Sequence, residues 1–290
     1  MSTLNYVAPT TVADAVKALA GASGTARVLS GGTDLLVQLR SGRLRPDLIV
    51  DAKRIPGMIG ITQKDGAFTI GAATPCAEIG DHAAFTAMWP GVSEAACLIG
   101  STQVQGRASL AGNLCNASPA ADSVPALIAA RVVCVVAGPN GEREMPVEAV
   151  AIAPGRTSLA KGELLVAFRF PKRPPRSSDA YLRFIPRTEM DIAVVGAGVS
   201  VTLDAKGVCT DAHVALGAVA PTAVLVPDAA KALIGHTLDD ATLAKLDAAA
   251  RAACKPIDDK RGTIEYRIKV AGVITRRTAA IAFERAGGAK

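Results

Sequence analysis

SLAGNLCNASPAADS, residues 109–123, is a run of small and hydrogen-bonding residues set between apolar segments. Nine of its fifteen positions are Ser, Gly, Ala or Pro, whereas a tight turn needs only about two to five residues of turn chemistry. Residues with little Cβ bulk let main-chain N–H groups point outward, toward an extended polar ligand. The run therefore predicts a long loop that binds a phosphate group. A loop without a ligand is the alternative.

A shorter run, SGGTDLL at residues 30–36, has the same character. Residues 26–29 before it predict a strand, and Leu35, Leu36 and Leu39 have helical spacing behind it. In a strand, glycine turn and helix, free N–H groups converge on one point, and the helix dipole adds about 0.3–1 kcal/mol for an anion there. Charge-assisted hydrogen bonds, at roughly 1.5–3 kcal/mol each, contribute more. Asp34 cannot face a phosphate unshielded, so we assign it a capping or backbone-bonding role.

Composition indicates a globular protein with more than one unit. The 290 residues lie in the range of roughly 250–300 at which single hydrophobic cores stop growing, and half of them are hydrophobic. Aromatic residues make up only 3%, which leaves little material for stacking nucleic-acid bases. The net charge of +6 comes from Lys and Arg scattered among Asp and Glu. We therefore expect no nucleic-acid partner.

The six cysteines lie eighteen or more residues apart, without a CxxC pair or a histidine at ligand spacing. They predict reduced thiols and no metal site. The N-terminus lacks a signal pattern, and no stretch reaches roughly eighteen unbroken apolar residues. The expectation is a cytoplasmic protein.

Hydrophobic periodicity divides the chain into an α+β sequence of elements. Before residue 172 it predicts helices at 10–20, 34–39, 76–84, 92–99 and 122–130, and strands at 6–9, 26–29, 48–51, 58–62, 68–71, 132–136 and 164–170, with a strand returning to Pro146. Beyond residue 178 it predicts antiparallel strands at 181–185, 192–203, 208–216 and 222–226, then helices at 228–234, 239–253 and 263–285.

KRPPRSS, residues 172–178, is charged and rich in proline and serine, which is typical of a linker. We place the domain boundary there. The predicted units are residues 1–175, with subdomains of about 1–55 and 56–175, and residues 176–290.

IAVVGAGVSV, residues 192–201, begins like a dinucleotide-binding motif, but Val201 replaces its third glycine. Val199, Val201 and Leu203 alternate with polar residues, so a strand continues where a phosphate-binding helix would begin. The three histidines are far apart, and none sits in a nucleophile motif. No general acid, base or nucleophile is assigned.

With both small-residue runs placed, the chain resembles the FAD-binding subunit of the molybdenum hydroxylases, the xanthine dehydrogenase and aerobic carbon monoxide dehydrogenase family. SGGTDLL and SLAGNLCNASPAADS are similar to the family's two flavin loops. YLRFIPRTEMDIAVV at 181–195 is similar to the entry of its C-terminal domain, and YRIKVAGVITRRT to its final helix.

The resemblance implies a vanillyl-alcohol-oxidase or PCMH-type FAD-binding fold followed by a C-terminal α+β flavoprotein domain. It implies that one wall of the FAD site is formed by Leu29, Ser30, Gly31, Gly32, Thr33 and Asp34. The other wall would comprise Ser109, Gly112, Asn113, Cys115, Asn116, Ser118 and Asp122, with Leu165 and Arg183 near the adenine or flavin ring.

Two residues depart from the family pattern. Ala111 stands where the family usually has a glycine. Alanine permits a close approach of the ligand only if its φ is negative. Arg183 stands where lysine is common, and it keeps a positive charge that favours a reduced, anionic flavin.

By resemblance, this chain passes electrons from a small subunit with two [2Fe-2S] clusters to NAD+ or a quinone. A large subunit would hold the molybdenum cofactor and the substrate, in a dimer of heterotrimers. A quinone acceptor would place the assembly at the inner face of the membrane. A self-sufficient flavin oxidase or reductase and a non-catalytic binding protein are the rival functions. The substrate of the whole enzyme stays open.

Overall fold

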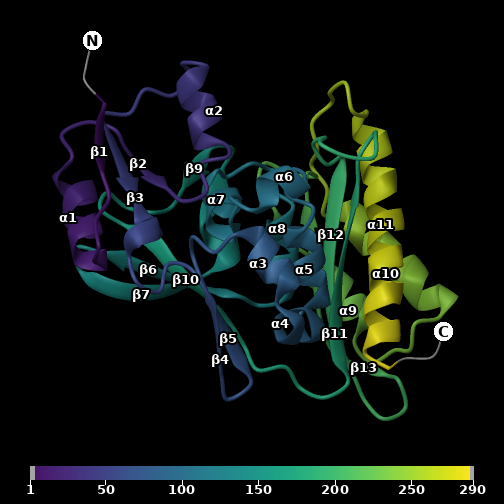
Figure 1. Cartoon of the computed structure of the whole chain (residues 1–290). Helices are drawn as coiled ribbons and strands as arrows, with labels where there is room; N and C mark the ends of the chain where they lie inside the picture. Colours follow the sequence, from purple (N-terminus) through teal and green to yellow (C-terminus); the bar gives the residue numbers. More distant parts are fainter. Residues whose placement is uncertain (1–3, 288–290) are drawn as a thin grey trace.

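The computed structural model describes residues 4–287, in which three blocks follow one another along the chain (Figure 1). The first block is a parallel sheet in the order β1-β3-β2. Its elements are β1 Asn5–Val7, α1 Val12–Gly21, β2 Ala26–Leu29, α2 Leu35–Arg40 and β3 Leu48–Asp51. Thr11 caps α1 by accepting a hydrogen bond from the Asp14 N–H. The predicted strand at 26–29 is confirmed.

The second block is built on an antiparallel sheet in the order β4-β5-β10-β6-β7. Its strands are β4 Ile61–Lys64, β5 Ala67–Gly71, β6 Val133–Gly138, β7 Gly141–Pro146 and β10 Leu164–Phe170, beside the small pair β8 Ala151–Ala153 and β9 Arg156–Thr157. Its helices are α3 Cys76–Asp81, α4 Ala83–Met88, α5 Pro90–Ala96, α6 Thr102–Gln105, α7 Leu110–Cys115 and α8 Ser123–Ala129. The hairpin predicted from the sequence is present as β4 and β5, but its first strand begins three residues later than expected.

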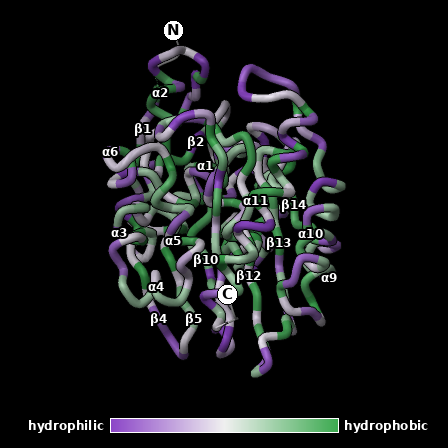
Figure 2. Tube along the Cα trace, turned by 90° about the vertical axis from the view of Figure 1, so that its right-hand side faces the viewer, coloured by the Kyte–Doolittle hydropathy of each residue, from purple (hydrophilic) through white to green (hydrophobic). Residues whose placement is uncertain are grey.

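The third block is an antiparallel sheet in sequence order, from β11 to β14. Its elements are β11 Ser177–Phe184, β12 Val195–Leu203, β13 Cys209–Gly217, β14 Val224–Leu225, α9 Pro227–Leu233, α10 Asp240–Ala252 and α11 Ile264–Arg285. The sheet lies between α5 and α8 of the second block and its own α11, and α10 packs on α11 (Figure 1). In Figure 2, β12 and β13 contain hydrophobic stretches, while the turn between β4 and β5 is hydrophilic. The predicted α+β class is confirmed, and β12 runs through Gly196 and Gly198 as one strand.

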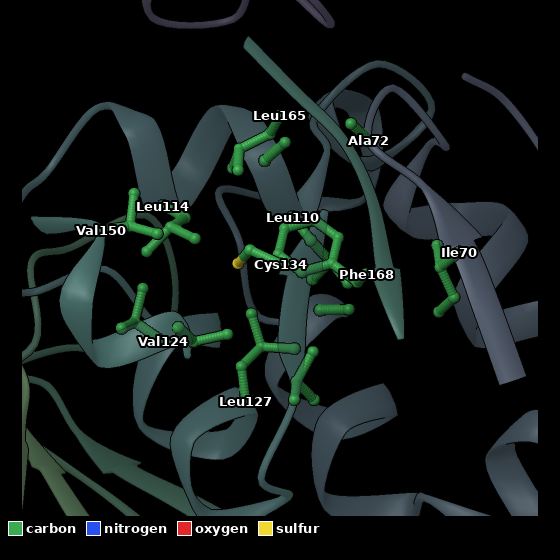
Figure 3. Packing of buried hydrophobic residues seen from close by; sticks show 14 of the residues in the cluster. Ile70, Ala72, Leu110, Leu114, Val124, Leu127, Cys134, Val150, Leu165 and Phe168 are labelled. Carbon is green, nitrogen blue, oxygen red and sulfur yellow. The ribbon is translucent and has the colours of Figure 1, made fainter. Parts of the chain in front are cut away.

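Residues 109–123 differ from the predicted continuous loop, because they contain the helix α7. Leu110 and Leu114, one turn apart, are buried in the core of the second block. In Figure 3 they point toward Cys134 of β6 and Phe168 of β10. Packing of these two leucines stabilises a helix that the local run of small residues did not indicate.

The predicted helix at 76–84 is also divided. It becomes α3 and α4, which meet at His82, whose Nδ1 accepts a hydrogen bond from the Phe85 N–H at 3.1 Å. His82 thus ends one short helix and caps the next.

Arg173, in the segment predicted as a linker, packs against the second block. Arg173 lies with its guanidinium carbon 3.9 Å from the centroid of the Trp89 ring, and it donates to Asp179 Oδ1 at 2.7 Å. Both of these charged side chains are at least 94% buried, with exposures of 6% and 2%. Arg173 is therefore an anchor between blocks, not a solvated linker residue.

None of the helices in residues 4–287 combines the length and the hydropathy that a bilayer crossing requires.

Candidate functional site

A cleft of about 640 Å³ opens between the first sheet, α7 and the segment that leads into β10. Both small-residue runs line it, although 79 residues separate Ser30 from Ser109. Eleven of the predicted binding residues line this cleft: Ser30, Gly31, Gly32, Thr33, Asp34, Ser109, Gly112, Asn113, Cys115, Asn116 and Leu165. The volume is in the range of small-molecule and cofactor sites.

The four other predicted residues lie outside the cleft lining. Leu29 supports the first turn, since its Cδ1 would lie 2.9 Å from a Cβ on Gly32. Ser118 accepts a hydrogen bond from the Ala120 N–H at 3.3 Å. Asp122 and Arg183 line a second cavity, described below.

The first wall presents unused main-chain donors to the cleft. Gly32 has φ of +81°, which glycine adopts at low cost. Within residues 4–287, the N–H groups of Gly31, Gly32, Thr33 and Asp34 donate no hydrogen bond. Four successive free amides face the cleft, a geometry that is suited to binding an anion.

Asp34 does not have the capping role that we expected. Its carboxylate forms no cap hydrogen bond with α2. Partial desolvation in the cleft raises the pKa of Asp34 above its ordinary value. Protonation of this carboxyl would therefore become easier as an anion approached.

The second wall is the start of α7. Ser109 caps this helix by accepting a hydrogen bond from the Gly112 N–H at 3.1 Å, and the Asn113 N–H donates to the Ser109 carbonyl oxygen at 3.0 Å. The N–H group of Ala111 has no acceptor within the described part of the chain. Ala111 lies in the helix and not among the residues with positive φ, so alanine can replace the family's glycine here.

Direct contacts hold the two walls together. Ser30 Oγ and Ser109 Oγ are 2.7 Å apart, and Gln38 Nε2 donates to Asn116 Oδ1 at 3.2 Å. Gly31 approaches the backbone of Arg107 so closely that a Cβ would lie 1.7 Å from its carbonyl oxygen. Glycine at position 31 is thus required by the packing of one wall on the other.

Asn113 has a structural role as well as a place in the cleft. Its Oδ1 accepts hydrogen bonds from the Ser123 Oγ at 2.7 Å and from the Ser123 N–H at 3.2 Å. Ser123 is fully buried. The amide NH₂ of Asn113 is the part that is left to contact a ligand.

A buried polar cluster joins β11 to the end of the second run. Arg183 Nη1 donates to Asp122 Oδ2 at 2.6 Å and to the Leu98 carbonyl oxygen at 2.9 Å. The Tyr181 hydroxyl donates to Asp122 Oδ1 at 3.1 Å. Burial raises the pKa of Asp122 to about 6, although Arg183 and Tyr181 act in the opposite direction. The cluster lies at a second cavity of about 360 Å³, which Arg187 and Arg261 also line.

The thiols have no shared site. Cys115 lines the cleft, but burial raises its pKa to about 12, so it stays protonated at neutral pH. Among residues 4–287 no group of three or more His, Cys, Asp or Glu side chains could hold a metal ion.

Residues 155–165 form a third wall, of which the sequence predicted only Leu165. This wall includes Arg156, Lys161 and Gly162. Gly155 and Gly162 have φ of +70° and +89°. Gly155, before Arg156, and Gly162, after Lys161, were local signals of turns. Nothing in their spacing indicated that they line this cleft.

Comparison with known proteins was consistent along the whole chain. Residues 2–173 match the family model described as the FAD binding domain in molybdopterin dehydrogenase, and residues 180–282 match the CO dehydrogenase flavoprotein C-terminal domain. The chain belongs to the FAD-binding medium subunits of the molybdenum hydroxylases. Its predicted fold, its oxidoreductase class and its FAD cofactor are confirmed.

Its relatives are similar over almost their full length. The chain is 31% identical to the 6-hydroxypseudooxynicotine dehydrogenase complex subunit alpha of Paenarthrobacter nicotinovorans, covering 97% of this chain and 95% of the relative. It is 32% identical to the carbon monoxide dehydrogenase medium chain of Afipia carboxidovorans, covering 97% of each. A solved structure, reconstituted CO dehydrogenase from Oligotropha carboxidovorans, superposes with a TM-score of 0.92 at 31% identity, covering 98% of both chains.

The cleft fits the cofactor of this family. FAD needs donors for a diphosphate and an elongated groove for its two ring systems. The four free amides, the close approach at Gly31 and the apolar side chains of Val28 and Leu165 meet these needs.

Proposed function

We propose that this chain is an electron-transfer subunit, which accepts electrons from a [2Fe-2S] partner and passes them to an external acceptor, NAD+ or a quinone. The observation that supports it is the cleft in which two distant small-residue runs meet and present free amides. FAD supplies one- and two-electron redox chemistry, and the protein holds, tunes and shields it.

In this proposal the chain's residues divide the work of binding. The amides of residues 31–34 and of Ala111 bind the diphosphate. Asn113 and Asn116 line the groove beside it, and Leu165 contributes an apolar floor. The flavin ring would extend toward the second cavity, where Arg183, held by Asp122 and Tyr181, provides the positive charge that favours a reduced, anionic ring.

The proposed units are a FAD-binding domain of residues 1–175, with subdomains of about 1–55 and 56–175, and a C-terminal flavoprotein domain of residues 176–290. The names of the relatives describe a subunit of a complex and a medium chain, which supports assembly with a large molybdenum-cofactor subunit and a small iron–sulfur subunit. We further propose a dimer of such heterotrimers, cytoplasmic, and at the inner membrane face when a quinone is the acceptor.

Reconstitution tests the role in electron transfer. The chain and its co-purifying partners are mixed with the donor substrate, and flavin reduction is followed by absorbance at each stage. We expect the flavin to be reduced only when both partner subunits are present. Steady turnover of an organic donor by the isolated chain would instead establish a self-sufficient oxidase.

A further inference from the structure

The third wall of the cleft, residues 155–165, is held rigidly against its surroundings. The Gly155 N–H donates to the Ala117 carbonyl oxygen at 2.9 Å, which ties this wall to the segment after α7. Glu163 accepts from the Ala160 N–H at 2.8 Å and is gripped by Arg143 through bonds of 2.7 and 2.8 Å. A Cβ on Gly162 would lie 2.9 Å from the Pro139 side chain. The turn that carries Lys161 is therefore preorganised.

The wall adds positive charge to the cleft. Arg156 and Lys161 line it, together with Arg27 of β2. Among residues 4–287, none of these three forms an ion pair. Glu163 is already paired with Arg143, so Asp34 is the unpaired carboxylate that faces them in the lining. The cleft thus has more cationic than anionic groups available to a ligand.

The donors of the first two walls do not account for this charge. The amides of residues 31–34 and of Ala111 can bind one phosphate group and part of a second. A diphosphate linked to a second nucleoside extends beyond them. Exposed cations on a rigid third wall are suited to its remaining oxygens, since Lys and Arg bind phosphate through charge-assisted hydrogen bonds.

We propose that Arg156 and Lys161 recognise the adenylate half of FAD, and that they make the chain select FAD over FMN. The inference rests on the proposed location of FAD in this cleft. Arg156 and Lys161 are binding residues that lie outside both small-residue runs.

Binding of FAD and FMN to the apoprotein tests the proposal. The double variant Arg156→Ala/Lys161→Ala is compared with Lys206→Ala/Arg277→Ala, which removes the same charge from exposed positions on the third block. Loss of two partly exposed phosphate contacts predicts about tenfold weaker FAD binding and a change of less than about twofold for FMN. The control variant should bind both flavins as the wild type does. Added salt should weaken FAD binding by the wild type more than by the double variant.

Two results would overturn the proposal. The first is unchanged FAD affinity in the double variant, and the second is an equal loss for FAD and FMN. Gly32→Val separates this failure from failure of the proposed site, because it alters the first wall that both flavins share. If Gly32→Val kept full affinity for both flavins, the location of FAD in this cleft would be wrong. If it lost both while the double variant kept FAD, only the role of the third wall would fall.

Discussion

Replacing Gly31 with alanine should push the first two walls of the cleft apart. The new Cβ would lie 1.7 Å from the Arg107 carbonyl oxygen and 2.5 Å from its carbonyl carbon. Contacts of Cβ atoms essentially never fall below 3.0 Å. The two segments must therefore separate by about 1.3 Å, and no side-chain rotation can relieve the contact because both partners are backbone.

The expected loss of stability has two parts. Overpacking of this kind costs about 1–3 kcal/mol. A shift of this size would also lengthen the 2.7 Å contact between Ser30 Oγ and Ser109 Oγ beyond hydrogen-bonding range, which costs about 0.5–1.5 kcal/mol more. For a chain of 290 residues we expect the melting temperature to fall by roughly 2–7 °C. Displacing one charge-assisted bond to the diphosphate should weaken FAD binding about ten- to a hundredfold.

Thermal unfolding of the apoprotein and fluorescence titration with FAD measure these two effects. Gly106→Ala is the matched control, because it lies one residue before Arg107, has φ of −65°, and offers nothing within 4 Å of a new Cβ. It should change stability by less than about 1 kcal/mol. A Gly31→Ala protein with wild-type melting temperature and wild-type FAD affinity would refute the close-packed cradle.

Three further predictions concern single residues. Because burial raises the pKa of Asp122 from 3.8 to about 6, the folded state holds this proton more tightly than the unfolded chain. The contribution of Asp122 to the free energy of unfolding should be complete below about pH 4, and about 3 kcal/mol of it should be lost as the pH rises to about 6. In urea unfolding, Asp122→Asn should not show this loss. Asn113→Ala leaves the buried Ser123 donors unpaired, so it should destabilise the apoprotein by about 1–3 kcal/mol, and an unchanged urea midpoint would contradict this. Gly32 and Gly207 have the same φ of +81°, so alanine is equally strained at both positions. Only at position 32 would the new Cβ contact neighbouring side chains, so flavin content should fall for Gly32→Ala and not for Gly207→Ala.

Local patterns in the sequence predicted most of the elements. Alternating apolar residues indicated β12, and this alternation correctly rejected a dinucleotide motif around Gly196 and Gly198. The glycines and threonine at 31–33 indicated a turn between a strand and a helix. Such patterns are informative because strand pleat, helix period and turn φ are properties of neighbouring residues.

Other features were not visible locally. The run at 109–123 has no amphipathic pattern long enough to indicate α7, and that helix is stabilised by burying Leu110 and Leu114. Arg173 read as a solvated linker residue because its sequence neighbours are proline, lysine and arginine. Its position against Trp89 depends on a residue more than eighty positions earlier.

The sequence by itself determined the two small-residue runs, because glycine, serine and asparagine set the backbone's local freedom, and the resemblance of these runs to the flavin loops of a known family indicated the family and the cofactor. Only the tertiary structure decided that Ser30 meets Ser109, that Gly31 must be glycine, and that Arg156 and Lys161 complete the cleft. These contacts join residues far apart in the chain, so they depend on how whole sheets and helices pack and not on the conformation that each segment prefers alone.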